Sequence, residues 1–219
     1  MFKNYSLLFI FSLFFYSCAG TSVKDQDAIR NLLEQQEYSK ALETLEESPL
    51  RSDKKAQLLY LMEKASLFYY KGDFYQASQV YSKANDLVDK LYTKSVREKI
   101  ASSILNDNSE KFYGAIFERS FLYFYQSLSF YRLAQTGHYY IKDQAKPKSD
   151  TLKQVILSDN QKRVYFDRSR SSLLAWDSFF SHLRRSGGFK SFLIQDLTSK
   201  IMAAKIHELL NKRSDREVA

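Results

Sequence analysis

Residues 61–84 read LMEKASLFYYKGDFYQASQVYSKA, and this stretch decides the fold class. The small or bulky apolar residues that recur at three- to four-residue spacing are Leu61, Ala65 and Phe68 before Lys71-Gly72-Asp73, and Ala77, Tyr81 and Ala84 after it. Such spacing predicts two amphipathic helices, and the glycine between them predicts a tight turn. Small residues at matching positions let antiparallel helices approach closely, so the stretch predicts a helical hairpin.

The composition of the whole chain also favours helices. Six glycines and two prolines in 219 residues supply little of the turn chemistry that a many-stranded β protein or a glycine-rich phosphate loop requires. Apolar residues make up 44% of the chain and aromatic residues 16%, which favours a packed globule over disorder. A single domain is therefore expected over residues 25–219.

The hairpin at residues 61–84 resembles a tetratricopeptide repeat (TPR). Its run from Gly72 to Ala77, GDFYQA, is similar to the G-D-Y-x-x-A turn of that family, whereas Lys64 departs from the usual Leu. The run from Tyr38 to Ala41, followed by Leu45, repeats the second half of this pattern upstream. The resemblance implies an all-α fold of TPR-like hairpins, an α-α superhelix, over about 25–92. Further packed helices must cap it, because two hairpins cannot bury all of their faces.

An aromatic stripe predicts a long helix that ends at Thr136-Gly137. Its members are Tyr113, Phe117, Phe121, Phe124, Leu128 and Tyr131. Other apolar residues widen the stripe, so this helix is expected to be covered on more than one side and to lie centrally. Aromatic-rich helices are predicted over about 94–219, interrupted by a loop over about 142–159 because Lys146 to Asp150 reads KPKSD.

The first residues have the order of a secretory signal. Lys3 precedes the apolar run LLFIFSLFFY at 7–16, and Ser17-Cys18 follows. The run is shorter than the roughly 20 residues that span a bilayer, which disfavours a retained transmembrane helix. Cys18 is the single cysteine of the chain, and Phe15-Tyr16-Ser17-Cys18 resembles a bacterial lipobox, although Phe15 and Tyr16 depart from the usual Leu and small residue.

The lipobox resemblance implies removal of residues 1–17 as a lipoprotein signal peptide, a diacylglycerol on Cys18 and a short linker over 18–24. Acyl chains would hold the protein on a membrane, since each buried methylene contributes about 0.8 kcal/mol. No Asp follows Cys18, which is compatible with the outer membrane and a domain that faces the periplasm. The alternative is an ordinary signal peptide with an incidental cysteine.

Short motifs further along are similar to a family of uncharacterised TPR-containing bacterial lipoproteins. They are Tyr113-Gly114, Glu118-Arg119, Ala175-Trp176-Asp177 and the run AAKIHE at 203–208. The similarity would cover most of the chain after Cys18. It implies an envelope location, and members are similar in placement to envelope proteins found near regulators of peptidoglycan synthesis.

Aromatic side chains and a charged pair are the candidate partner-binding residues. Glu118 and Arg119 lie within the aromatic helix, where they could contact a ligand, form an interhelical salt bridge or lie on a solvated edge. The aromatic residues of the hairpins could line a peptide groove or belong to the core. These aromatic candidates are Phe68, Phe74, Tyr75 and Tyr81.

A basic segment at residues 162–190 is the main electrostatic candidate. It carries seven basic residues against two acidic ones, a local balance of +5. The segment could contact anionic lipid, cell-wall polymer or an acidic partner, or it could be a solvated helix face. The basic patch proposed within it consists of Arg163, Arg168, Arg170, Arg184 and Arg185.

No catalytic site, metal site or cofactor is expected. His138, His182 and His207 lack the spacing that puts two ligands on one helix face, and Asp177 is poorly aligned with His182 for acid–base work. With Cys18 committed to the anchor, no thiol remains. The formal charge of +8 would suit nucleic acid as well as lipid, but an exported protein rarely meets nucleic acid, so none is expected.

The sequence therefore predicts a non-enzymatic, lipid-anchored scaffold or adaptor of the cell envelope that binds a protein partner through its hairpins. One alternative is a module that binds lipid or cell-wall polymer through residues 162–190, linked to peptidoglycan synthesis. Another is an envelope enzyme that acts on cell-wall glycans. Such an enzyme needs two convergent carboxylates, and the sequence shows no convincing pair.

Overall fold

The computed structural model describes residues 21–91, 116–143, 151–185 and 197–210, and the chain there is mainly helical, as predicted. In chain order the elements are α2 (Thr21–Glu34), α3 (Tyr38–Glu47), the 3-10 helix η2 (Pro49–Arg51), α4 (Gln57–Tyr70), α5 (Phe74–Leu91), α7 (Ile116–Thr136), β1 (His138–Lys142), β2 (Leu152–Ile156), α8 (Asp159–Arg185) and α9 (Leu197–Leu210). The predicted signal peptide and Cys18 lie outside the described residues. Because α2 begins at Thr21, residues 21–24 of the predicted linker are helical.

The turn between α4 and α5 forms where the sequence predicts it. Gly72 has a φ of +84°, the left-handed conformation that glycine adopts without steric cost at the end of a helix. The Asp73 amide donates to the Phe68 carbonyl oxygen at 2.9 Å, which closes the C-terminus of α4. The Asp73 carboxylate then accepts a hydrogen bond from the Gln76 amide at 3.1 Å and caps the N-terminus of α5.

Small residues bring the hairpin helices together, as the sequence predicts. Ala41, Ala65, Ala77 and Ala84 are all fully buried. Lys64, the departure from the TPR pattern, forms an ion pair with Glu46 of α3, and its Nζ also lies 3.2 Å from the Tyr60 hydroxyl. This polar contact ties α4 to α3 alongside their apolar core.

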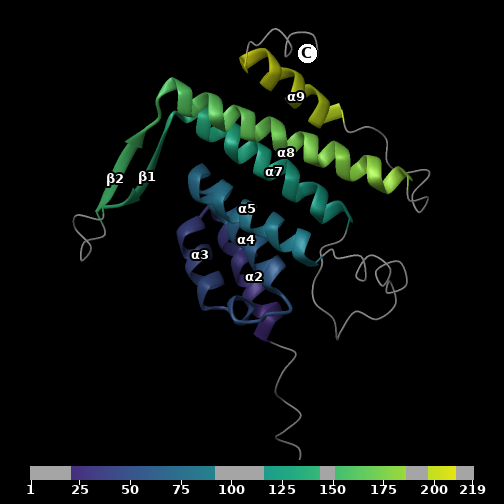
Figure 1. The fold of residues 1–219 in the computed structure, drawn as a ribbon. Coiled ribbons are helices and arrows are strands. Elements are labelled where there is room, and N and C mark those ends of the chain that lie inside the picture. The colour runs from purple at the N-terminus through teal and green to yellow at the C-terminus, as the bar shows by residue number, and fades with distance from the viewer. Residues whose placement is uncertain (1–20, 92–115, 144–150, 186–196, 211–219) are drawn as a thin grey trace, which may run out of the picture.

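Helix α7 lies between the hairpins and α8, and α9 covers α8 from the far side (Figure 1). Gln126 of α7 connects the helices on both of its sides. Its Oε1 accepts a hydrogen bond from Asn85 of α5 at 2.6 Å and another from Ser172 of α8 at 3.2 Å. The predicted central position of the aromatic helix is confirmed. Its predicted stripe is wrong at Phe121, which is 54% exposed while the neighbouring Leu122 is buried.

The predicted loop over 142–159 is wrong at both of its ends. Strands β1 and β2 pair antiparallel there, with His138 opposite Ile156 and Lys142 opposite Leu152. The ribbon projects from the end of the α7–α8 pair (Figure 1). Tyrosine and β-branched residues favour strands, as at Tyr139, Tyr140 and Val155, whereas the turn-rich run at 146–150 led to the prediction of a loop. That run lies outside the described residues.

No helix within the described ranges is long and apolar enough to cross a lipid bilayer.

Candidate functional site

The predicted aromatic candidates take part in packing within the chain. Tyr81 is buried, and Phe68 packs between the core of the α4–α5 hairpin and that of α2 and α3. The Phe74 ring contacts the Arg132 guanidinium of α7 at 5.2 Å. Tyr75 stacks on Tyr139 of the ribbon, with ring centroids 4.0 Å apart. Tyr81 thus belongs to the core, whereas Phe68, Phe74 and Tyr75 are half-buried and pack against neighbouring side chains.

An open pocket lies between α4, α5 and α7, next to these residues. Its volume is about 230 Å³. Below it is called the α4–α7 pocket, and its lining residues are Met62, Ser66, Tyr81, Phe121, Leu122 and Tyr125. The Tyr81 hydroxyl lies 2.9 Å from the Ser66 hydroxyl, so the pocket lining combines polar and apolar groups.

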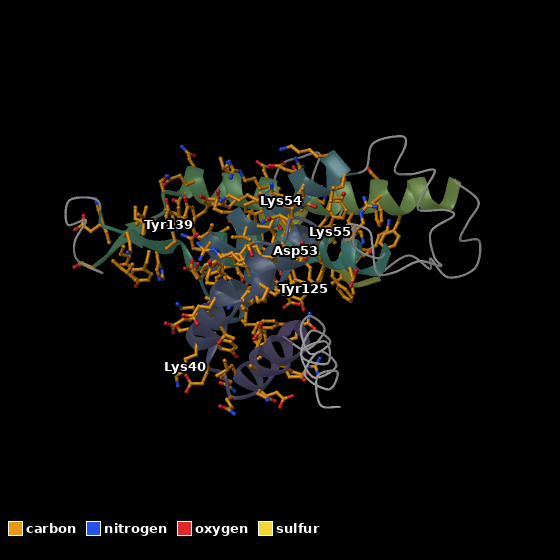
Figure 2. All side chains as sticks on the ribbon, turned by 90° about the horizontal axis from the view of Figure 1, so that it is seen from below. Lys40, Asp53, Lys54, Lys55, Tyr125 and Tyr139 are labelled. Atoms are coloured by element: carbon orange, nitrogen blue, oxygen red, sulfur yellow. The ribbon has the colours of Figure 1, made fainter. Side chains whose placement is uncertain are left out.

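A tyrosine cluster borders the pocket on its C-terminal side. Tyr125 is its centre, with ring centroids 5.4 Å from Tyr69, 6.5 Å from Tyr70 and 6.4 Å from Phe121. Tyr70 is 48% exposed and stacks on Tyr38 at the start of α3. Figure 2 shows Tyr125 in the middle of the molecule, well apart from Tyr139 on the ribbon. The cluster thus extends the pocket across the hairpin surface.

The tyrosine hydroxyls act as neutral hydrogen-bonding groups. The Tyr70 and Tyr125 hydroxyls lie 3.4 Å apart, and this contact, together with burial, raises the pKa of Tyr125 to about 12. Burial also raises the pKa of Tyr81. Neither group can act as a base near neutral pH, because each would first have to lose a tightly held proton.

Two carboxylates on α4 and α7 act on each other electrostatically. Glu63 lies between the lining residues Met62 and Ser66 in the sequence of α4, and Glu118 precedes the lining residue Leu122 of α7 by one helical turn. Burial, and then the negative charge of Glu118, raise the pKa of Glu63. Glu63 was missed by sequence reasoning, because nothing local in the chain indicates that α4 and α7 are neighbours.

Glu118 and Arg119 act on different neighbours. Glu118 is half-buried and acts on Glu63 of α4. Arg119 is buried against α8, and its guanidinium carbon lies 4.5 Å from the centre of the Phe179 ring. Adjacent helical residues point about 100° apart, which explains the separation.

The basic residues of α8 are partly used in contacts within the chain. Arg168 lies over the rings of Phe130 and Tyr165, at 5.8 and 5.6 Å from their centres. Arg170 pairs with Asp167 at 3.3 Å. Arg163 is exposed, and the side chains of Arg184 and Arg185 lie outside the described residues. The described part of α8 therefore does not present a continuous basic patch.

Metal-ligating side chains do not gather in the described ranges: no group of three or more His, Cys, Asp or Glu residues there could hold a metal ion. His138 lies on β1 and His207 is buried on α9, far along the chain from each other. Asp177 is exposed on α8, and the side chain of His182 lies outside the described residues.

Comparison with models of protein families, with curated proteins and with solved structures finds no match to this chain. Function therefore has to be inferred from the geometry of the α4–α7 pocket.

Proposed function

We propose that this chain is a lipid-anchored, non-enzymatic adaptor of the bacterial cell envelope that binds a protein partner at the α4–α7 pocket. The exposure of Phe121 carries the proposal: this large ring is 54% exposed at the rim of a pocket, on a helix that is otherwise covered from two sides. Exposed aromatic residues beside pockets are typical of protein interfaces, where they supply much of the binding energy.

The size of the pocket supports a side-chain ligand. Sites for drug-sized small molecules usually enclose about 300–1,000 Å³, whereas this pocket has about 230 Å³. A single large apolar side chain of a partner would fill much of it, and the neighbouring tyrosine cluster offers hydroxyls to the partner backbone. The pocket is too small to enclose a segment of glycan chain.

The carboxylate pair is the observation that favours the alternative function, an envelope hydrolase. A retaining or inverting glycosidase needs two carboxylates on opposite sides of a bound sugar. The charge of Glu118 acts on Glu63, and neither carboxylate belongs to the lining of the α4–α7 pocket. The pair therefore fits recognition better than hydrolysis.

The predicted anchor supports a location at a membrane surface. Cys18 precedes the start of α2 by three residues, so lipid on its sulfur would hold the helical body close to the bilayer. The acyl chains would supply the membrane affinity and the α4–α7 pocket the partner affinity, two separate tasks for two parts of the chain.

Site-specific photo-crosslinking in the native host tests the proposal. The photoreactive residue benzoylphenylalanine replaces Phe121 in one full-length protein and Leu174 in another, since Leu174 is 57% exposed on α8, away from the pocket. We expect one recurring envelope protein to be captured from position 121 and not from position 174. Capture from both positions alike, or from neither, would refute binding at the pocket.

A further inference from the structure

The α4–α7 pocket has a buried base and an exposed rim. Tyr81 and Leu122 are fully buried, whereas Phe121 is exposed. The Tyr81 hydroxyl bonds to Ser66, which also lines the pocket, so this hydroxyl lies at the lining. A side chain that entered past Phe121 would therefore reach a pair of hydroxyls, those of Ser66 and Tyr81, which is called the hydroxyl pair below.

The hydroxyl pair leaves one hydrogen unused. Ser66 and Tyr81 together carry two hydroxyl hydrogens, and the bond of 2.9 Å between their oxygens uses one of them, whichever group is the donor. In the described part of the chain neither hydroxyl has a further hydrogen-bond partner. Burial raises the pKa of Tyr81, so its hydroxyl keeps its hydrogen at neutral pH. The pair thus offers one donor, and oxygen lone pairs, to a ligand in the pocket.

The walls of the pocket suit an aromatic ring. The Tyr125 ring lies 6.3 Å from that of Tyr81, at an interplanar angle of 13°, and 6.4 Å from that of Phe121, at 45°. Met62 adds a thioether, which packs favourably against ring edges. Aromatic rings attract one another in offset-stacked and edge arrangements, beyond the gain from apolar burial alone. A further ring is therefore favoured here over an aliphatic side chain.

Hydrogen-bonding capacity distinguishes the three aromatic side chains. A phenylalanine of the partner would leave the spare hydrogen without an acceptor in a site closed to water, which costs free energy. A tryptophan offers an N–H donor and no acceptor, so it cannot take that hydrogen either. A tyrosine hydroxyl can accept the spare hydrogen and donate its own. The pocket volume of about 230 Å³ leaves room for one such side chain.

We infer that the partner inserts a tyrosine side chain into the α4–α7 pocket, with its ring against Phe121 and Tyr125 and its hydroxyl hydrogen-bonded to the hydroxyl pair. This inference rests on the proposed function and names the residue that the pocket takes. A site built to hydrogen-bond a hydroxyl rejects the analogue that lacks it, because the polar groups of the site are then left unpaired. The pocket therefore selects tyrosine over phenylalanine.

Nuclear magnetic resonance of the methionine methyl groups tests the inference. Met62 lines the pocket, whereas Met202 lies on α9, on the far side of α8 (Figure 1). Full-length protein in detergent micelles, labelled with ¹³C at these methyl groups, is titrated with N-acetyl-tyrosinamide, N-acetyl-phenylalaninamide and N-acetyl-tryptophanamide. Met62→Leu identifies the Met62 signal. We expect the tyrosine compound to shift this signal and not that of Met202, with a Kd about fivefold or more below those of the other two compounds, the factor that one hydrogen bond supplies.

Variants that remove one hydroxyl separate this role from a merely structural one. Ser66→Ala should raise the Kd of the tyrosine compound to that of the phenylalanine compound, and should leave the latter within about twofold of its wild-type value. Tyr81→Phe should do the same from the other side of the pair. Ser171→Ala, at an exposed position of α8, is the matched control and should keep the preference. An unchanged Met202 signal shows that each variant is folded.

Two results would overturn the inference and leave the proposed function standing. One is a phenylalanine or tryptophan compound that shifts Met62 and binds as tightly as the tyrosine compound. The other is a preference for tyrosine that survives both Ser66→Ala and Tyr81→Phe. A Met62 signal that none of the compounds shifts would overturn the inference as well, and the crosslink at position 121 then decides the proposed function on its own.

Discussion

The contact between α7 and α8 depends on two serines, and replacing them is a sharp test of the fold. Ser127 and Ser169 are fully buried. The Ser127 hydroxyl lies 2.9 Å from the Ser169 carbonyl oxygen, the Ser169 hydroxyl lies 2.8 Å from the Ser127 carbonyl oxygen, and the two hydroxyls are 2.8 Å apart. The small size of these serines lets the two helices approach closely, and each hydroxyl donates a hydrogen bond to a carbonyl oxygen of the other helix.

The expected losses of stability follow from these contacts. Ser127→Ala and Ser169→Ala should each lower the free energy of unfolding by about 1 kcal/mol, the usual net value of a buried hydrogen bond. This corresponds to a drop in Tm of about 2–4 °C for a chain of this size. The double variant should lose less than the sum, by about 0.5 kcal/mol or more, because the two hydroxyls share partners. Ser127→Leu should cost more, since a bulky side chain forces the helices apart.

Urea denaturation followed by circular dichroism measures these free energies. Ser171→Ala is the matched control, because Ser171 is an exposed serine of α8 whose hydroxyl bonds to the Asp167 carbonyl oxygen in its own helix at 2.9 Å. Its effect should stay within about 0.5 kcal/mol. Losses at Ser127 and Ser169 that match the control, or that add fully in the double variant, would refute the interlocked contact. Tolerance of Ser127→Leu would do so too.

Three further predictions test other parts of the account. Leu45→Ala should lower the free energy of unfolding by about 2–5 kcal/mol, because Leu45 is fully buried between α2, α3 and α4, whereas the exposed Leu174→Ala should cost under about 0.5 kcal/mol in the same urea titration. Burial and the charge of Glu118 raise the pKa of Glu63, so the contribution of Glu63 to stability is present at acid pH and is lost as the pH rises through that pKa. The variant Glu63→Gln should therefore raise Tm at pH 7 and leave it nearly unchanged at pH 4. A lower Tm of this variant at pH 7 would contradict the assignment. Cys18→Ala should abolish metabolic labelling with an alkyne fatty acid and leave the protein soluble or as uncleaved precursor in membrane fractionation, and unchanged labelling would refute the anchor.

The hairpins could be predicted from sequence because their determinants are local. The Gly72 turn and the alanines that bring α4 and α5 together all lie within residues 61–84. The end of α7 could be predicted in the same way, because Gly137 directly follows Thr136 and adopts the left-handed conformation, with a φ of +69°. In each case a few neighbouring residues set the backbone conformation, and distant contacts only reinforce it.

The buried face of α7 was harder to predict, because on this helix the apolar residues are not the ones that are most deeply buried. Ser127 and Ser129 are fully buried while Phe121 is largely exposed, the reverse of what a hydrophobic stripe predicts. Close packing of α7 against α8 selects small side chains, and serine can satisfy its hydroxyl within a helix, as Ser129 does with the Tyr125 carbonyl oxygen at 2.7 Å. Residue size outweighed polarity.

The candidate site itself could not be read from the sequence. Its walls come from α4, α5 and α7, and residues 92–115 separate α7 from the other two helices. Sequence periodicity does not reveal which helices become neighbours. Tyr81, a candidate from the sequence, lies in the pocket lining with a buried side chain. Glu63 could not be singled out from the sequence, because its raised pKa depends on burial and on the charge of Glu118, which lies on another helix.

The affinity of the partner captured at position 121 is the most direct test of the central claim, that the α4–α7 pocket is the binding surface. That partner is titrated against wild-type protein, Phe121→Ala and Leu174→Ala, two variants that truncate similarly exposed side chains. Phe121→Ala should raise Kd by about tenfold or more, because truncation of an aromatic interface residue commonly costs about 2 kcal/mol. Leu174→Ala should leave Kd within about twofold of the wild type. An unchanged Kd for Phe121→Ala would contradict the claim.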